Sequence, residues 1–310
     1  MTENVPPFER RVHLIMGKGG VGRTTVAVSM AQAAALRGKR VLLTEVGDPE
    51  ATKSAIGAFF GREELRVEPE HVAPGIDACR LWAEKGQESF ARTVLPTGPL
   101  VKTALRSRAM RRLMSAAPAF HELGIFYHLL SLLELCGKDG QEQYSAVIVD
   151  MPATGHALAL AELPKITLQV ISRGPLPNAM RRGQAYINNP AVTAAWVVTL
   201  PEQLPVTESL ELLEGLKRTG VPAAGVILNR HLDNYFSKAE IEVIEGALQD
   251  HPVRGTTSFQ RIQTADRSST RLRESTDLPI VQLDNIVNPI NGDPSPALAN
   301  ALNQVAGSLR

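Results

Sequence analysis

The chain has 310 residues, of which 44% are hydrophobic and 21% are charged, and its formal net charge at pH 7 is +1. These values are typical of a globular protein with one large core or two modest ones. The near-neutral charge gives no electrostatic reason to expect a nucleic acid or an anionic membrane as partner. The two cysteines lie far apart in the sequence, and no signal peptide or membrane span is visible, so we expect a cytoplasmic protein.

Strand-like and helix-like segments alternate along the chain, which predicts an α/β fold with a mainly parallel sheet flanked by helices. Helices are expected over residues 24–37 and 297–309, and the proline-rich segments 174–177 and 288–296 predict loops. The expected strands are near-continuous apolar runs, which is typical of strands buried on both faces. These strands cover residues 12–16, 41–45, 146–150, 194–199, 224–229 and 280–283.

A long stretch of about residues 50–143 separates the second expected strand from the third, which is too much for one crossover helix. We expect one or two short strands near residues 76–82, then several helices that form a subdomain inserted into a single domain of residues 1–310. Residues 120–135 are apolar at helical spacing and predict a core helix. Residues 100–112 are basic and form either a solvated helix face or a contact surface for an acidic partner.

The most informative segment is G-K-G-G-V-G-R-T-T at residues 17–25, because it follows the P-loop pattern G-x-x-x-x-G-K-[ST] with arginine in place of lysine. Its glycines let backbone N–H groups converge on phosphate oxygens, and the next helix points its positive end at the same phosphates. The hydroxyl of Thr24 is expected on a magnesium ion. The predicted nucleotide site consists of Gly17, Lys18, Gly19, Gly20, Val21, Gly22, Arg23, Thr24 and Thr25.

The same glycines also fit the dinucleotide pattern G-x-G-x-x-G, and Glu45 ends the next strand where such a fold places a ribose-binding acid. This alternative is an oxidoreductase that binds NAD or FAD without magnesium. Residues 23–25 decide against it, because a dinucleotide does not need Arg-Thr-Thr at the helix start, whereas a triphosphate with magnesium does. Lys18 adds a positive charge that also favours phosphate.

A second phosphate-binding element is predicted at residues 144–156, which read Y-S-A-V-I-V-D-M-P-A-T-G-H. The apolar strand delivers Asp150 at its carboxyl end, where open α/β sheets bind ligands. Asp150 could hold a magnesium-bound water, and Gly155 leaves the backbone free to donate to a γ-phosphate. The structural alternative is an aspartate that caps the following helix.

Together these segments resemble the ArsA family of deviant P-loop ATPases, which includes arsenite-pump ATPases and the eukaryotic ATPase that guides tail-anchored membrane proteins. Residues 17–25 differ from the family form G-K-G-G-V-G-K-T-T only at Arg23, and residues 150–156 are close to D-T-A-P-T-G-H. The resemblance covers nearly the whole chain. It implies a magnesium-dependent ATPase that acts as a dimeric switch coupled to an unidentified protein client, as a homodimer or as a heterodimer with a related ATPase.

The resemblance also implies roles for single residues. Lys18 would be the signature lysine that reaches across a dimer to the other subunit's nucleotide, and Arg23 would stand at the β/γ-phosphate position. Thr24 and Asp150 would hold Mg²⁺.

The second switch, by the same resemblance, is the turn formed by Thr154, Gly155 and His156. Asn229, at the end of its strand, looks like the asparagine that reads adenine, while a plain strand-terminal turn is an equal alternative.

Arg23 is the first departure from the family pattern. Arginine binds phosphate through a planar fork but is longer than lysine, so nucleotide binding is expected to survive while transition-state geometry suffers. A slow ATPase is therefore expected, and the alternative is a hydrolysis-deficient regulatory subunit that pairs with an active paralogue.

The first switch is the second departure, because the family form S-T-D-P-A-H is replaced by L-T-E-V-G-D-P-E at residues 43–50. Asp48 is the first choice for the carboxylate that positions the attacking water, and Glu45 is the second.

Cysteine content is the third departure. Cys79 and Cys136 cannot supply the clustered thiolates of an arsenite site, and the paired cysteines with which the tail-anchor ATPase binds zinc are missing. We therefore expect neither metal resistance nor tail-anchor targeting from the resemblance alone.

Overall fold

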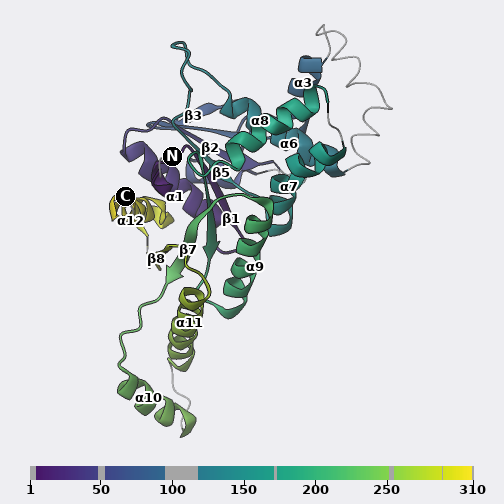
Figure 1. The fold of residues 1–310 in the computed structure, drawn as a ribbon. Coiled ribbons are helices and arrows are strands. Elements are labelled where there is room, and N and C mark those ends of the chain that lie inside the picture. The colour runs from purple at the N-terminus through teal and green to yellow at the C-terminus, as the bar shows by residue number, and fades with distance from the viewer. Residues whose placement is uncertain are drawn as a thin grey trace.

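The computed structural model describes residues 5–47, 53–94, 118–170, 173–250, 255–287 and 289–308. Its eight strands form one sheet in the order β3-β4-β2-β5-β1-β6-β7-β8, which is parallel except where β3 pairs with β4 (Figure 1). The predicted α/β fold with a mainly parallel sheet is therefore confirmed. The strands are β1 (Val12–Gly17), β2 (Val41–Val46), β3 (Glu70–Ala73), β4 (Ile76–Leu81), β5 (Ala146–Asp150), β6 (Thr193–Thr199), β7 (Ala223–His231) and β8 (Ile280–Asp284).

All six strands expected from the apolar runs are present, and their ends lie within two residues of the predicted ends. The two expected helices are also present, as α1 and α12. The helices are α1 (Arg23–Leu36), α2 (Ala55–Phe59), α3 (Ala83–Val94), α6 (Pro118–Leu133), α7 (Thr154–Val170), α8 (Pro175–Ile187), α9 (Gln203–Thr219), α10 (Lys238–Asp250), α11 (Thr256–Ser275) and α12 (Ser295–Ser308). No helix within these described ranges is long and apolar enough to cross a lipid bilayer.

The inner strands β1, β5 and β6 are buried on both faces, and β1 lies in the middle of the sheet between the other two. Leu14 and Met16 of β1 pack in a cluster with α6, α7 and α8, whereas Ile15 packs on the opposite face with α1 and α12. Figure 1 shows these two helical layers on either side of the strands. Because both faces of these inner strands are buried, their sequences are mostly apolar without alternation.

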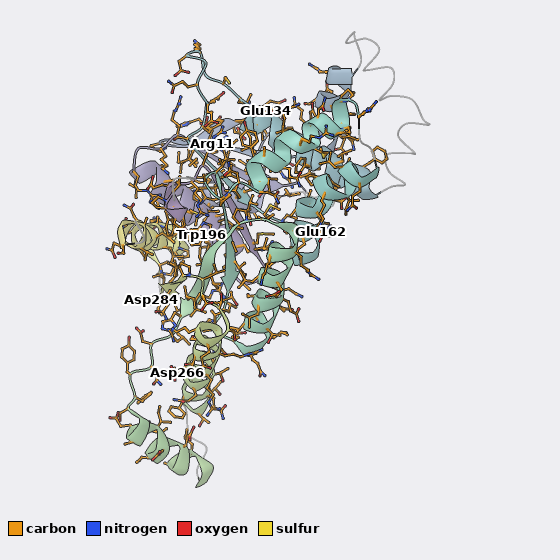
Figure 2. All side chains as sticks on the ribbon, in the orientation of Figure 1. Arg11, Glu134, Glu162, Trp196, Asp266 and Asp284 are labelled. Carbon is orange, nitrogen blue, oxygen red and sulfur yellow. The ribbon has the colours of Figure 1, made fainter. Side chains whose placement is uncertain are left out.

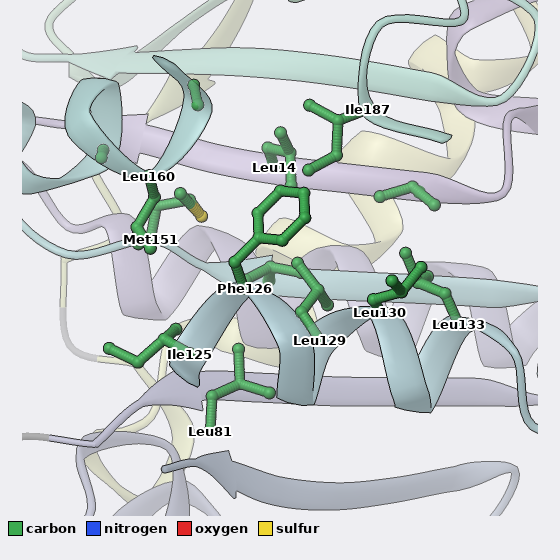
Figure 3. Packing of buried hydrophobic residues seen from close by; sticks show 14 of the residues in the cluster. Leu14, Leu81, Ile125, Phe126, Leu129, Leu130, Leu133, Met151, Leu160 and Ile187 are labelled. Atoms are coloured by element: carbon green, nitrogen blue, oxygen red, sulfur yellow. The ribbon is translucent and has the colours of Figure 1, made fainter. Parts of the chain in front are cut away.

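Helix α6 supplies much of the first cluster and confirms the core helix expected over residues 120–135. In Figure 3, the Phe126 ring of α6 points toward Leu14 of β1, and Ile187 lies beside Leu14. Leu130 is 1% exposed. The burial of these apolar α6 side chains stabilises the packing of α6 on the sheet, because it removes their surface from water.

The segment after β2 is helical only in part. Strand β4 pairs in parallel with β2, and β3 extends the sheet as an antiparallel edge strand, so both belong to the main sheet and not to a helical subdomain. The strand expected near residues 76–82 is thus confirmed as β4, while α3 and α6 supply helices after it. The basic residues 100–112 lie outside the described residues.

Helix α8 corrects the loop predicted over residues 174–177, because the helix begins at Pro175. Proline is well suited to the first turn of a helix, where its missing N–H has no intrahelical acceptor. Gly174 precedes it with a φ of 110°, a conformation that glycine adopts easily.

The parallel strands all end at the same side of the molecule. In Figure 2, Arg11 precedes β1 at one end of the sheet, Trp196 lies within the sheet, and Asp284 marks the carboxyl end of β8. The loops after β1, β5, β6 and β7 therefore gather at the carboxyl end, which is where open α/β sheets bind ligands.

Replacing Leu130 with alanine should lower the free energy of unfolding by about 2–5 kcal/mol, because it leaves a cavity between α6 and the sheet. Urea unfolding checks this. Leu36, which is 65% exposed at the end of α1, is the matched control, and Leu36→Ala should change the free energy by about 0.5 kcal/mol or less. Equal effects of the two substitutions would contradict the described packing.

Candidate functional site

The P-loop connects β1 to α1 and depends on glycine at several positions. A Cβ on Gly17 would lie 2.5 Å from the carbonyl oxygen of Val198 in β6, which is closer than atoms can approach. Gly20 and Gly22 have φ values of 86° and 90°, in the left-handed region that glycine favours. The glycine spacing seen in the sequence thus serves a tight turn against the neighbouring strand.

Helix α1 begins without a capping side chain. Gly22 is its N-cap residue and has no side chain to offer, and the first turn contains no acidic residue. The first N–H groups of a helix lack intrahelical acceptors and sit at the positive end of its dipole. This end of α1 is therefore suited to bind an anion such as a phosphate group.

Thr24 and Asp150 meet where α1 approaches the end of β5. The Thr24 hydroxyl donates to Asp150 Oδ2 at 2.6 Å, and the Asp150 side chain is buried. Burial raises the pKa of Asp150 to about 6, although the Thr24 hydrogen bond and the Arg23 charge act in the opposite direction. The other oxygen, Oδ1, is buried and has no hydrogen-bond partner among the described residues.

This pair of oxygen ligands fits a magnesium ion. Hydroxyl and carboxylate oxygens are the protein ligands that Mg²⁺ prefers, and a buried carboxylate oxygen without a partner is costly unless a cation or donor satisfies it. The structure therefore brings the two predicted metal-binding residues, Thr24 and Asp150, to within hydrogen-bonding distance of each other.

The Arg23 side chain, like that of Thr24, is directed toward the end of β5. Its guanidinium donates a hydrogen bond to the carbonyl oxygen of Met151, the residue after Asp150. Burial lowers the pKa of Arg23, and the nearby Asp150 partly offsets this shift. The P-loop arginine thus connects the start of α1 to the backbone of the predicted second switch.

The Lys18 side chain is directed toward α9 and not toward the end of β5. Its ammonium lies 2.8 Å from the Glu208 carboxylate on α9, the helix that follows β6, and its side chain is 54% exposed. The hydrogen bond to Glu208 raises the pKa of Lys18. Sequence reasoning missed Glu208, since no motif links two residues so far apart in the chain.

Asn229 is buried at the end of β7 and supports the P-loop from behind. Its Nδ2 donates to the Val21 carbonyl oxygen at 2.9 Å, and its Oδ1 accepts from the Arg230 backbone N–H at 3.0 Å. A Cβ on Gly22 would collide with the Asn229 side-chain amide. Both ends of the amide are therefore engaged with backbone, and the role in adenine recognition stays a prediction.

The other residues predicted for the site lie at the start of α7, in the first turn of α1, or outside the described residues. Helix α7 begins at Thr154, so the second switch leads directly from β5 into a helix, and Gly155 is exposed with open space where a Cβ would stand. Thr25 lies in the first turn of α1, where its carbonyl oxygen accepts from the Ser29 hydroxyl. Asp48 lies outside the described residues.

Glu45, the second choice for positioning water, is held elsewhere. Its Oε1 lies 3.1 Å from Nε of Arg80 on β4, and both side chains are buried. Its Oε2 accepts from the Ile56 backbone N–H at 3.0 Å, which fixes the start of α2. The Arg80 guanidinium also lies over the Trp82 ring, 5.0 Å from its centre. Glu45 thus ties the segment after β2 to the sheet.

The sequence model of the anion-transporting ATPase family matches residues 10–174, which is more than half of the chain. The chain belongs to the ArsA family of P-loop ATPases. The matched range contains the P-loop, Asp150 and the start of α7, so the family assignment and the geometry concern the same site. The protein is accordingly an ATP-binding ATPase.

Similar proteins are found in bacteria and in a eukaryote. ATPase BagA of Mycobacterium tuberculosis is 26% identical over 250 residues, which cover 79% of this chain and 72% of the relative. An arsenical pump-driving ATPase of Escherichia coli is 26% identical over 261 residues, which cover 81% of this chain and 40% of the relative. ATPase GET3 of Lachancea thermotolerans is 23% identical over 248 residues, which cover 70% of each chain.

Replacing Asn229 with alanine should weaken the binding of ATP and of inorganic tripolyphosphate by a similar factor, because the P-loop loses its support. Each lost buried hydrogen bond of this kind costs about 1–3 kcal/mol. Isothermal titration calorimetry with the two ligands measures both effects. A loss of ATP affinity with unchanged tripolyphosphate affinity would instead assign Asn229 to the adenine base.

Proposed function

We propose that this ATPase binds Mg·ATP at the P-loop and acts as a dimeric switch that couples ATP binding and hydrolysis to a protein partner. The observation that carries the proposal is the hydrogen bond between Thr24, at the uncapped start of α1, and Asp150, whose Oδ1 has no hydrogen-bond partner among the described residues. Thr24 and Asp150 would hold the magnesium ion. When bound, this ion would neutralise charge on the β- and γ-phosphate oxygens.

The switch consists of the segments that flank these residues. The backbone at Met151 continues from Asp150 into α7, so a change at the γ-phosphate is passed to α7 and to its neighbours α6 and α8. His156, at the start of α7, has its Nδ1 3.7 Å from Glu122 Oε1 of α6, so the two side chains are neighbours where these helices approach each other. Ordering of such loops by a γ-phosphate is a known means of shifting a conformational equilibrium. The partner would read the new position of these helices.

The Lys18 side chain supports the dimeric part of the proposal. Its ammonium is exposed and turned toward α9, away from the Thr24–Asp150 pair of its own chain. It is therefore placed to serve the nucleotide of a second subunit, which is a second copy of this chain in the homodimeric form of the proposal and a related ATPase in the heterodimeric form.

A second candidate function is a regulatory subunit that binds ATP without hydrolysing it. Its support is Arg23, whose Nη1 donates to the Met151 carbonyl oxygen, so that this donor is directed at the backbone and not at a phosphate. A hydrogen bond of this kind competes with the stabilisation of charge that develops in the transition state.

The turnover of Mg·ATP by the purified protein decides between the two, with Thr24→Ala as the blank. Turnover that the blank lacks supports the ATPase switch. ATP binding without turnover supports the regulatory subunit.

Replacing Arg23 with lysine should raise the turnover number about tenfold or more, because one well-placed donor to a developing charge contributes at least this factor. A steady-state assay of phosphate release measures it at saturating Mg·ATP. Arg37→Lys, a substitution at the far end of α1, is the control and should leave turnover unchanged. A fall in turnover for Arg23→Lys would mean that the site is adapted to arginine.

Asp48 remains the proposed residue for positioning the attacking water, since Glu45 is engaged with Arg80 and with the Ile56 N–H. Asp48→Asn should abolish hydrolysis while leaving ATP binding within about twofold, because the substitution removes the charge but keeps the shape. Rates of phosphate release and calorimetric binding constants are measured together. Unchanged turnover would overturn this assignment.

A further inference from the structure

One ion pair of the site is not explained by nucleotide binding. Lys18 belongs to the P-loop, yet its ammonium contacts Glu208, which lies 190 positions later in the chain, in the second turn of α9. Glu208 is partly buried, and Glu211, one turn further along α9, adds negative charge near the same ammonium. The exposed loop is thus held by an acidic face of α9.

The two cations of the P-loop are separated by the order of the strands. Strand β1 lies between β5 and β6, so residues after β1 can turn toward either neighbour. Arg23 and Thr24 turn to the β5 side, where they contact Met151 and Asp150. Lys18 turns to the β6 side and contacts α9. In this ion pair the Lys18 ammonium is directed at Glu208 of its own chain and not at the Thr24–Asp150 pair.

We propose that Glu208 is a positioning residue that holds Lys18 within its own subunit and thereby raises the protein concentration at which two ATP-bound subunits associate. The inference rests on the proposed function, since it assumes that Lys18 acts on the nucleotide of a second copy. Breaking the ion pair is then one cost of forming the dimer.

The size of this cost follows from the exposure of the pair. An ion pair between exposed side chains typically changes an equilibrium constant by roughly 1.4- to fivefold. A symmetric dimer breaks two such pairs, so the expected effect on its dissociation constant is about two- to 25-fold. High salt screens the pair and should reduce this effect.

The test compares the wild-type chain with Glu208→Gln, which keeps the shape of the side chain and removes its charge. Analytical ultracentrifugation measures the dimer dissociation constant with Mg²⁺ and a slowly hydrolysed ATP analogue, in 50 mM and in 500 mM NaCl. In 50 mM NaCl the dimer dissociation constant of Glu208→Gln should be about two- to 25-fold lower than that of the wild type. The difference between the two proteins should be smaller in 500 mM NaCl. Glu214→Gln, an exposed position further along α9, is the matched control and should behave as wild type.

A double-mutant cycle with Lys18→Ala separates positioning from a structural effect. If Glu208 acts through Lys18, Glu208→Gln has no further effect on dimerisation in the Lys18→Ala background. A persisting effect in that background would overturn the proposal, because Glu208 would then act by another route.

The remaining outcomes are equally decisive. Dimers that form with the same dissociation constant in wild type and Glu208→Gln overturn the role of Glu208 and leave the dimeric switch standing. Weaker dimers in Glu208→Gln would make Glu208 a contact between subunits, which also overturns the proposal. If neither protein dimerises with nucleotide, the homodimeric form of the switch fails, and the role of Glu208 fails with it.

Discussion

The site depends on the position of β1 between β5 and β6, because this strand order places the P-loop between the end of β5 on one side and the β6–α9 segment on the other. On the β5 side the buried Asp150 receives the Thr24 hydroxyl, and on the β6 side α9 presents Glu208 to Lys18. The backbone of Gly17 fits against Val198 of β6 only because it lacks a Cβ. The P-loop is thus shaped by its neighbours as much as by its own sequence.

Most of the fold was predictable because both faces of the inner strands are buried. Short continuous apolar runs such as that of β5 are typical of such strands, so the ends of the expected strands were predicted to within two residues. Strand β3, by contrast, is a half-exposed edge strand of sequence E-H-V-A and has no such signal. The start of α8 at Pro175 was missed because proline marks both loops and helix starts.

The site was predictable where its residues are neighbours in sequence and not where they meet through folding. The glycines of the P-loop, Thr24 and the strand-end Asp150 belong to local patterns whose chemistry is known. The partners Glu208 of Lys18, Val21 of Asn229 and Arg80 of Glu45 come from distant segments, and only the order of the strands brings them together. These contacts determine the orientation of Lys18, Asn229 and Glu45. The sequence therefore predicted a nucleotide site, but it could not predict the hydrogen bonds and ion pairs that orient these side chains.

The most direct test of this account is the effect of magnesium on nucleotide affinity. Isothermal titration calorimetry would compare ATP binding with Mg²⁺ and with EDTA, in the wild-type chain and in Asp150→Asn. The account predicts that Mg²⁺ strengthens ATP binding in the wild type and has little effect in Asp150→Asn, because the buried carboxylate beside Thr24 holds the ion. The same magnesium dependence in both proteins would contradict the placement of the metal at Thr24 and Asp150.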